Sequence, residues 1–422
     1  MSVAIPIKHC RLKFLSQLNM GQSPPSEDVT RFDEGDGLPF LQGNAEFGSV
    51  SPSYKHTCNN PPKTAVMGNL LVSVRAPVGA LNVADQTYGI GRGLCALKWT
   101  RIDLRFGWWA LHHHRVKLNE VATGSTYEAV SAEDLGNLVL SFPDEQSQRL
   151  IANYLDRETA RIDGLIAEKE RMLALLEEKR AALISRAVTR GLDPNAPLKP
   201  SGQEWLGEIP MHWRLERLKF HLLGLEQGWS PQCDNYPAEL DDWGVLKVGA
   251  VNTWTFNPSE NKRLPDELEP LREYEIKPHD VLMSRANTTQ LLGSVVYVHE
   301  ISSKLLLCDK LYRLNVNDDE VDREFLVAFL RASPGRFQLE REASGTSGSM
   351  QNIGQDAVQN AWIAIPPFDE QKRISRHVAE SRKDTEKIEA ALRRTVDLLR
   401  ERRAALITAA VTGQIPLEAM RG

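Results

Sequence analysis

KRAALISRAVTRG occupies residues 179–191, and RRAALITAAVTGQ occupies residues 402–414. The two stretches are nearly the same helix-forming sequence, repeated at an offset of 223 positions. The alignment at this offset needs no gap from Val130, which pairs with Ile353, to Thr189, which pairs with Thr412. An internal repeat of this length constrains the whole fold, because each copy must build the same structural unit.

The repeat continues towards the start of each half with a drifting offset. Arg11-Leu-Lys-Phe14 matches Arg217-Leu-Lys-Phe220, and Gly21-Gln-Ser-Pro24 matches Gly228-Trp-Ser-Pro231. Each half therefore consists of a variable front followed by a similar back. The predicted segments are a first front at 1–142, a helix at 143–190, a linker at 191–210, a second front at 211–365, a second helix at 366–413 and a tail at 414–422.

The two backs predict long helices. They are rich in Ala, Leu, Glu, Lys and Arg, which favour helix, and Gly191 and Gly413 mark their ends. Apolar residues recur in alternating steps of three and four, which indicates a coiled-coil seam. The predicted seam residues are Ile162, Leu165, Met172, Leu176 and Leu183 in the first helix and Ile388, Leu392, Leu399 and Leu406 in the second.

Neither predicted seam is fully apolar. Lys169 and Lys179 interrupt the first, and Thr385, Thr395 and Arg402 interrupt the second. We therefore expect the two helices to pack on each other or on partner subunits. The linker between the halves, GLDPNAPLKPSGQEWLGEIP at 191–210, holds four prolines and three glycines, which is typical of a strap or loop.

Both fronts predict a mixture of strands and helices. Residues 68–100 hold short runs rich in Val and Leu between Gly, Pro and Asn, which is typical of strands. DVLMSRA, GSVVYVHE and LYRLNVN predict strands of the second front in the same way. EFLVAFLRAS (324–333) predicts a helix, and GWWALHHHRVKL (107–118) is its expected counterpart. The fold class expected for each front is therefore α+β.

The bulk composition excludes several classes of protein. Charged residues make up 25% and hydrophobic residues 41% of the chain, as in globular proteins, and no apolar run approaches the ~18 residues of a membrane span. No signal-peptide stretch is present, and five scattered cysteines predict reduced thiols in the cytoplasm. Residues 191–365 hold 17 Lys and Arg against 26 Asp and Glu, which argues against purely electrostatic binding of DNA.

Three motifs resemble catalytic or metal-binding sequences, and each is better explained as structure. YGIGRG (88–93) has spaced glycines, but no helix is predicted after it, so we expect a turn at a strand edge. NNPPK (59–63) is similar to the Asn-Pro-Pro-aromatic motif of amino methyltransferases, but Lys63 replaces the aromatic residue that stacks on a flipped base. HHH (112–114) has no Cys or acid at ligand spacing nearby. We therefore predict no catalytic residue and no metal site.

Polar loops are the remaining candidates for function. SRANTTQ (284–290) and SGTSGSMQN (344–352) combine Arg, Asn and Gln, which contact base edges, with Ser and Thr, which hold phosphates. ATGSTYE (122–128) is the counterpart in the first front, and an ordinary glycine-rich turn is the alternative for each loop. The candidate DNA-binding residues are Arg75, Arg101, Arg105, Gly124, Ser125, Thr126, Arg285, Asn287, Thr288, Thr289, Ser347, Ser349, Gln351 and Asn352.

These features together resemble one family. Pro-x-x-x-x-Gln-x-x-Ile opens each helix, at Pro143 and Pro366, and Ala-Ala-Leu-Ile…Ala-Val-Thr closes each one. PSGQEWLGEIPMHW stands between the halves, and SVRAPVGALNV and YGIGRGLCAL lie in the first front. Over nearly its whole length the chain resembles the specificity subunit of type I restriction–modification systems. One departure is Asp144-Glu145, which replaces the second Pro and the following residue of the usual helix opening.

The resemblance implies two α+β target-recognition domains, separated by two long helices that form an antiparallel coiled coil with a pseudo-twofold internal repeat. Each domain would read one half of a split site in double-stranded DNA. The helices would dock two modification subunits, and separate motor-nuclease subunits would cleave the DNA. The chain itself would hold no cofactor, because adenosylmethionine, ATP and magnesium would belong to the partner subunits.

Two other functions are alternatives for such a sequence, a structural adaptor and a self-contained methyltransferase. A structural coiled-coil adaptor with two protein-binding heads would also explain the duplication, and its acidic second front would suit basic partners. A self-contained methyltransferase is disfavoured by the lack of adenosylmethionine and base-stacking motifs. The fronts are the variable part of the family, so the resemblance does not identify which residues touch DNA.

Overall fold

The computed structural model describes residues 7–33, 36–122, 129–347 and 350–421. Its contacts divide the chain into two compact units. Unit 1 comprises Met1–Glu170 with Arg393–Gly422, and unit 2 comprises Arg171–Leu392. In the part of the chain that is described, no helix has the length and apolar character needed to cross a membrane.

The front of unit 1 is built on a four-stranded antiparallel sheet with the order β2-β10-β7-β8. A short pair, β1 with β11, joins the two ends of the front, and β4 lies antiparallel to β5 and parallel to β9 in a second sheet. The strands are β1 (Lys8–Arg11), β2 (Ser16–Met20), β3 (Val29–Arg31), β4 (Leu38–Leu41), β5 (His56–Cys58), β6 (Thr64–Ala65), β7 (Leu70–Ser73), β8 (Leu81–Val83), β9 (Tyr88–Ile90), β10 (Leu94–Trp99) and β11 (Val139–Phe142).

Unit 2 repeats the main sheet, the end pair and the centre of the second sheet. Its four-stranded sheet has the order β15-β22-β18-β20, the end pair is β14 with β25, and β16 lies antiparallel to β17 and parallel to β21. The same topology from a divergent sequence confirms the internal repeat. The strands are β14 (Arg214–Arg217), β15 (Leu222–Gln227), β16 (Trp243–Leu246), β17 (Asn261–Arg263), β18 (Val281–Ser284), β19 (Ala286–Asn287), β20 (Val295–Tyr297), β21 (Lys304–Leu306), β22 (Leu311–Val316), β23 (Ser344–Ser347), β24 (Met350–Asn352) and β25 (Trp362–Ile365).

Helices follow the same repeat. Asp103 caps α1, its carboxylate accepting from the N–H groups of Arg105 and Phe106, and Asp322 caps α5 by accepting from Phe325. This confirms that the helix predicted around 107–118 is the counterpart of the one predicted at 324–333. The helices of the fronts are α1 (Leu104–His113), α2 (Arg115–Val121), α3 (Ala132–Asn137), α5 (Arg323–Arg331), α6 (Ser333–Arg341) and α7 (Gln355–Gln359).

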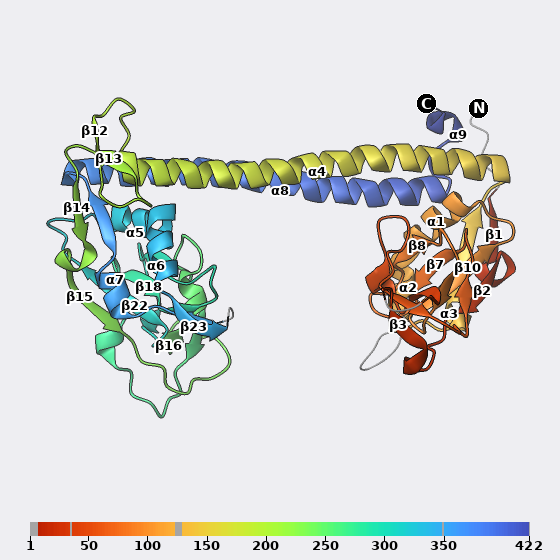
Figure 1. The fold of residues 1–422 in the computed structure, drawn as a ribbon, viewed down its shortest axis with the longest axis horizontal. Coiled ribbons are helices and arrows are strands. Elements are labelled where there is room, and N and C mark those ends of the chain that lie inside the picture. Colours follow the sequence, from red (N-terminus) through yellow and green to blue (C-terminus); the bar gives the residue numbers. More distant parts are fainter. Residues whose placement is uncertain (1–6, 34–35, 123–128, 348–349, 422) are drawn as a thin grey trace. The chain divides into compact units, whose positions relative to one another are not determined.

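The two backs are single long helices, α4 (Glu145–Arg190) and α8 (Phe368–Val411) (Figure 1). They run antiparallel, since Asp163 pairs with Arg403 in unit 1 and Arg180 pairs with Glu389 in unit 2. Gly191 and Gly413 end the helices with φ of 73° and 74°, a left-handed conformation that favours glycine. The linker forms a hairpin of β12 (Leu198–Pro200) and β13 (Glu208–Pro210), and the tail holds α9 (Leu417–Met420).

The seam between the helices has a different register from the predicted one. The less exposed positions of α4 recur at alternating spacings of four and three residues. The apolar residues at these positions include Ile162, Ile166, Leu173, Leu176 and Ile184. The same positions, shifted by 223, are inward on α8, and they include Leu392, Leu399 and Ile407. Four predicted seam residues are instead exposed, by 39 to 50%: Leu165, Met172, Leu183 and Ile388.

At Leu165, Met172 and Leu183 the predicted register was wrong because another apolar residue stands at the next position, whereas beside Ile388 the more buried position is that of Glu389. Leu165-Ile166 and Leu183-Ile184 satisfy either order of steps, so the sequence does not choose between them. The predicted and the observed registers share four residues: Ile162, Leu176, Leu392 and Leu399. Leu406 is partly buried beside Ile407.

Candidate nucleic-acid interface

A glutamine near the start of each long helix fastens that helix to its front. In unit 1, Gln148 accepts a hydrogen bond from the Asp103 N–H at 2.8 Å and donates to the Pro143 carbonyl at 3.0 Å. In unit 2, Gln371 makes the same two bonds, to Asp322 and Pro366, at 2.8 and 3.0 Å. Both side chains are buried. The Pro-x-x-x-x-Gln pattern therefore locks the capped helix of each front onto the long helix.

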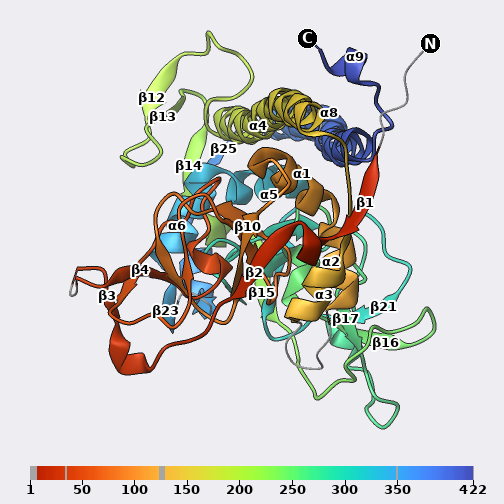
Figure 2. The ribbon, with the colours of Figure 1, turned by 90° about the vertical axis from the view of Figure 1, so that its right-hand side faces the viewer.

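Further contacts hold α1 against the long helices in unit 1. The Trp109 indole donates to Asp156 at 2.8 Å, and Arg105 forms an ion pair with the same carboxylate. A hydrogen bond of 3.0 Å joins the His113 imidazole to the Thr408 hydroxyl of α8. Figure 2 shows α1 lying between the long helices and the sheet. Each front is thus carried on its helices through a rigid, hydrogen-bonded contact.

The two polar loops predicted in the second front lie side by side in the structure. β19 from the first loop pairs with β24 from the second, with Ala286 opposite Asn352 and Asn287 opposite Gln351. β24 also pairs with β23, so the loops form one three-stranded sheet with the order β19-β24-β23. We call this sheet, with the adjoining turn at 288–290, the polar edge of unit 2.

Buried groups beneath the polar edge fix its position. The hydroxyl of Tyr312 donates to the Ile353 carbonyl at 3.0 Å and accepts from Arg285 at 3.2 Å. Asn287 donates to the Asn252 side chain at 2.8 Å and accepts from the N–H of Thr288. The edge is therefore held from below, which leaves exposed polar side chains such as Thr288 at the surface.

Arg336 on α6 contributes a second anchor that the sequence analysis did not identify. Its guanidinium donates to the backbone carbonyls of Thr289, Gln290 and Leu292 and also pairs with Glu340. One arginine thus fixes three carbonyls of the turn at 289–292. Its sequence neighbours, SPGRFQLER, give no signal of this role, because the turn lies 44 to 47 positions away.

Unit 1 has the same junction at the equivalent place. Arg75 forms an antiparallel bridge with Ala129, and the Val130 N–H donates to the Val74 carbonyl at 2.9 Å. The corresponding bond in unit 2 joins the Ile353 N–H to the Arg285 carbonyl, also at 2.9 Å. The exposed Arg75 therefore occupies the position that Ala286 occupies in the polar edge.

The candidate DNA-binding residues differ in how accessible they are. Arg75, Arg101, Thr288 and Thr289 are exposed, Arg285, Gln351 and Asn352 are half-buried, and Asn287 is buried. Arg105 is exposed but its guanidinium is paired with Asp156. Ser347 lies in β23, where its backbone pairs with Met350. Outside the described residues lie Gly124, Ser125, Thr126 and Ser349.

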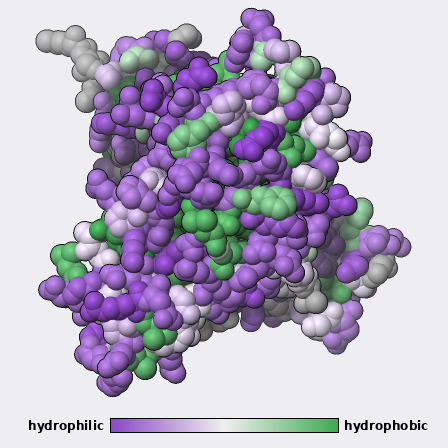
Figure 3. Space-filling view, turned by 90° about the vertical axis from the view of Figure 1, so that its left-hand side faces the viewer, coloured by the Kyte–Doolittle hydropathy of each residue, from purple (hydrophilic) through white to green (hydrophobic). Residues whose placement is uncertain are grey.

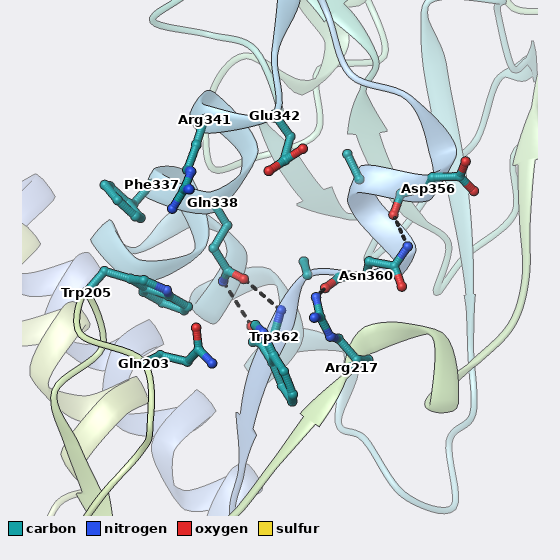
Figure 4. A pocket seen from close by; sticks show the side chains of 12 residues that line it. Gln203, Trp205, Arg217, Phe337, Gln338, Arg341, Glu342, Asp356, Asn360 and Trp362 are labelled. Carbon is teal, nitrogen blue, oxygen red and sulfur yellow. Dashed lines mark hydrogen bonds between the residues drawn. The ribbon is translucent and has the colours of Figure 1, made fainter.

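A separate pocket of unit 2 lies where the linker meets the front. Trp205 of the linker stacks on Phe337 with ring centroids 5.9 Å apart, and Arg217 lies 4.1 Å from the centre of the Trp362 ring (Figure 4). Gln338 donates to the Trp362 carbonyl at 3.0 Å and accepts from its N–H at 2.7 Å. The cavity measures about 380 Å³. These contacts account for the linker motif by fastening the strap to the front.

One face of the molecule is mostly polar. The face in Figure 3 is dominated by hydrophilic side chains, with hydrophobic ones in small separate groups. Among the described residues, no group of three His, Cys, Asp or Glu side chains could hold a metal ion. Burial lowers the pKa of His112 and His113, and it lowers that of His114 to about 4 with help from His113 and Lys117. The histidine triplet is thus packed where α1 ends and α2 begins.

Comparison with known proteins identifies the first half of the chain. Residues 7–172 match the family model described as Type I restriction modification DNA specificity domain. The chain is 30% identical over 197 residues to the EcoEI specificity subunit from Escherichia coli, covering 46% of this chain and 33% of that protein. It is 34% identical over 172 residues to the putative MjaX specificity subunit from Methanocaldococcus jannaschii, covering 40% and 39%. The chain thus spans well under half the length of these two relatives.

Solved structures match the fold over almost the whole chain. One, from a study of complex assembly and conformational transition of the type I R-M system, superposes with a TM-score of 0.73 at 17% identity, covering 98% of this chain and all of that one. The HsdS subunit from Thermoanaerobacter tengcongensis gives a TM-score of 0.50 at 17% identity, covering 97% and 98%. Residues 7–172 thus carry a type I restriction modification DNA specificity domain, and the chain as a whole is similar in fold to these solved structures of type I systems.

Proposed function

We propose that this chain is the DNA-reading subunit of a type I restriction–modification complex. Each front would read one block of a split target in double-stranded DNA. The observation that carries the proposal is the duplicated polar junction, at Arg75 and Ala129 in unit 1 and at Ala286 and Asn352 in unit 2. A single chain with two such edges of different sequence is suited to two different half-sites.

The chemistry of the edges supports readout by shape and by hydrogen bonds more than by charge. Thr288 and Thr289 present hydroxyl groups at the surface, and Gln351 is half-buried beside them. Amide and guanidinium groups discriminate bases in the major groove, and hydroxyl groups hold phosphates. The acidic balance of residues 191–365 disfavours tight non-specific binding.

The catalytic steps would belong to partner subunits. Adenosylmethionine, ATP and magnesium are expected on two modification subunits and on the motor-nuclease subunits. Apolar side chains exposed on the long helices offer these partners a surface, among them Leu175, Ile388 and Leu398, each at least half exposed. The family matches disfavour the alternative of a structural adaptor.

The decisive experiment is to sequence DNA methylation in cells with and without this gene. We expect loss of one methylated motif made of two short blocks around an unread spacer. Complementation with the wild-type gene is the control. A methylome that does not change, in a strain whose modification subunit is expressed, would reject the proposal.

A second experiment tests whether the helices set the spacer. Glu170 of α4 bonds to Arg400 of α8 at 2.9 Å, so one heptad inserted beside each residue keeps the seam in phase. Seven residues lengthen a helix by about 10.5 Å, or roughly three base pairs at about 3.4 Å each. We expect unchanged blocks and a spacer longer by up to about three base pairs. An active variant with an unchanged spacer would show that the helices do not set it.

A further inference from the structure

Each unit has a cleft between its front and the long helices, and the internal repeat makes the two clefts equivalent. In unit 1 the cleft is lined by Trp108 of α1, Thr159 of α4 and Val83 of β8. In unit 2 it is lined by Val327 of α5, Arg382 of α8 and Tyr297 of β20. Trp108 and Val327 each lie five residues after the capping aspartate, and Thr159 and Arg382 are related by the offset of 223.

In unit 2 the chain fills its own cleft with the indole of Trp254. The guanidinium groups of Arg331 and Arg382 lie 5.1 and 4.6 Å from the ring centre. Arg331 also donates to the Val251 carbonyl at 2.7 Å, which holds the Trp254 loop in place. Burial, together with the nearby Arg382, lowers the pKa of Arg331 to about 9. Both cations thus lie within cation–π distance of the ring, and a cavity of only about 90 Å³ remains.

In unit 1 the matching position of the loop is not aromatic, and the two aromatic residues of this loop, Phe47 and Tyr54, pack against the core of the front. Trp254 is the eighth residue after the end of β16, and Ser49 is the eighth residue after the end of the matching strand β4. Ser49 is exposed, and the neighbouring Val50 is 59% exposed. The cleft of unit 1 is correspondingly open, with a volume of about 480 Å³.

The walls of the open cleft suit an uncharged aromatic group. Leu104, Trp108, Trp109 and Val83 line it with apolar surface. The charged side chains at its rim already pair with each other, Arg105 with Asp156 and Arg403 with Asp163. An incoming group therefore needs no charge of its own, and an aromatic ring can use both the tryptophans and the Arg403 guanidinium.

We propose that the cleft of unit 1 binds an aromatic side chain of a partner subunit, in the place that Trp254 fills in unit 2. This inference rests on the proposed function, because it takes the partner to be the modification subunit that docks on unit 1. The occupant is a tryptophan, tyrosine or phenylalanine anchor. Unit 2 has no room for the same anchor, so the two units bind their partners by different contacts.

The first test uses the full chain and 5-fluoroindole, observed by fluorine NMR. The wild-type chain should bind this probe with a dissociation constant of roughly 1 mM, as expected for a ligand of ten heavy atoms. Ser49→Trp places an indole where unit 2 has one and should weaken probe binding at least tenfold. The matched control is Ser53→Trp, in the same loop but outside the cleft, which should bind the probe like the wild type.

The second test measures the affinity of the purified modification subunit for each variant. Ser49→Trp should lower the affinity for one bound copy by about 10- to 30-fold, the loss typical of an interface anchor, while Ser53→Trp should stay within twofold of the wild type. Circular dichroism and melting temperature confirm that both variants are folded.

Three outcomes overturn the inference: no probe binding by the wild type, equal probe binding by both variants, or probe binding blocked by Ser49→Trp without any change in partner affinity. The last outcome would mean that the cleft takes small aromatic molecules and no partner side chain. Failure of the proposed function is distinct, since it would appear as a wild-type complex that methylates no split motif.

Discussion

Unit 1 and unit 2 have the same arrangement of strands and helices but differ in the side chains of their cores and clefts. Both have the same strand order, a capped helix after the sheet and a buried glutamine that ties this helix to a long helix. Leu15 lies in the core of unit 1, and the equivalent position in unit 2 is the buried His221. The Nε2 atom of His221 lies 2.8 Å from the carboxylate of Glu216, and its Nδ1 atom lies 2.7 Å from the carboxylate of Glu320. The repeat has thus kept the anchoring contacts, while the core and the clefts have diverged.

This difference indicates which contacts the architecture requires. A contact present in both units, such as the glutamine anchor, serves the placement of a front on the helices. A contact present in one unit, such as Trp254 between two arginines, serves that unit alone. Variants at equivalent positions of the two units can separate these roles.

The largest expected effect is at the glutamine anchors. Gln371→Leu removes three hydrogen bonds, since this side chain also donates to the Glu320 carbonyl at 2.9 Å, whereas Gln148→Leu removes two. Unsatisfied buried groups cost about 1–3 kcal/mol each. We expect a loss of about 3 kcal/mol in unit 2 and about 2 kcal/mol in unit 1, measured by urea unfolding with hydrogen exchange to assign each unit. Equal losses would mean that the Glu320 bond contributes nothing.

The next effect concerns the polar edge. Arg336→Ala removes the donor that holds the turn at 289–292 and should relax the block read by unit 2. We expect a methylation rate about tenfold lower at the original motif, in line with the ~1–3 kcal/mol of a specific base contact. Lys117→Ala, on α2 of unit 1, is the control. Relaxation of both blocks would contradict a separate role for each unit.

A smaller effect is expected in the helix seam. Arg403 pairs with Asp163 at 2.8 Å and lies 5.9 Å from the Trp109 ring, whereas Arg180 reaches Glu389 only at 3.9 Å. Arg403→Met should therefore lower stability by about 1 kcal/mol, and Arg180→Met by about 0.5 kcal/mol, because partly exposed pairs are weak. Thermal unfolding of the two variants compares them. A larger loss of stability for Arg180→Met than for Arg403→Met would show that the Arg180 pair is the stronger of the two.

The last effect is a pH dependence from the histidines of unit 1, which is absent at neutral pH. An unfolded histidine takes up its proton near pH 6.5, but burial holds the pKa of folded His114 at about 4. The unfolded state therefore binds more protons between these values, and stability falls as the pH drops from about 6.5 to about 4. His114→Asn should flatten this slope in urea titrations, while His299→Asn, an exposed site of unit 2, should not. A slope that is unchanged in His114→Asn would show that other groups cause it.

The sequence by itself determined the duplication, the two long helices and the α+β class of the fronts. Helix-forming composition and a constant repeat offset are local and additive signals, so they can be recognised in the sequence without knowledge of the fold. The glycines that end the helices and the Pro-x-x-x-x-Gln pattern at their starts are also local signals, so the sequence was enough to identify them. The strands predicted in DVLMSRA, GSVVYVHE and LYRLNVN were confirmed, with the structure placing them at 281–284, 295–297 and 311–316, since short apolar runs between turns specify them locally.

Only the tertiary structure decided the contacts between distant segments. The seam follows Ile166 and Ile184 rather than Leu165 and Leu183, because the choice between adjacent apolar residues depends on the partner helix. The pairing of Asn287 with Gln351 joins loops more than sixty positions apart, a relation that no local pattern encodes. Likewise, Trp254 finds its place between Arg331 and Arg382 only once the front has packed on α8. Long-range packing set these positions because burial and hydrogen bonding act on neighbours in space, whatever their separation along the chain.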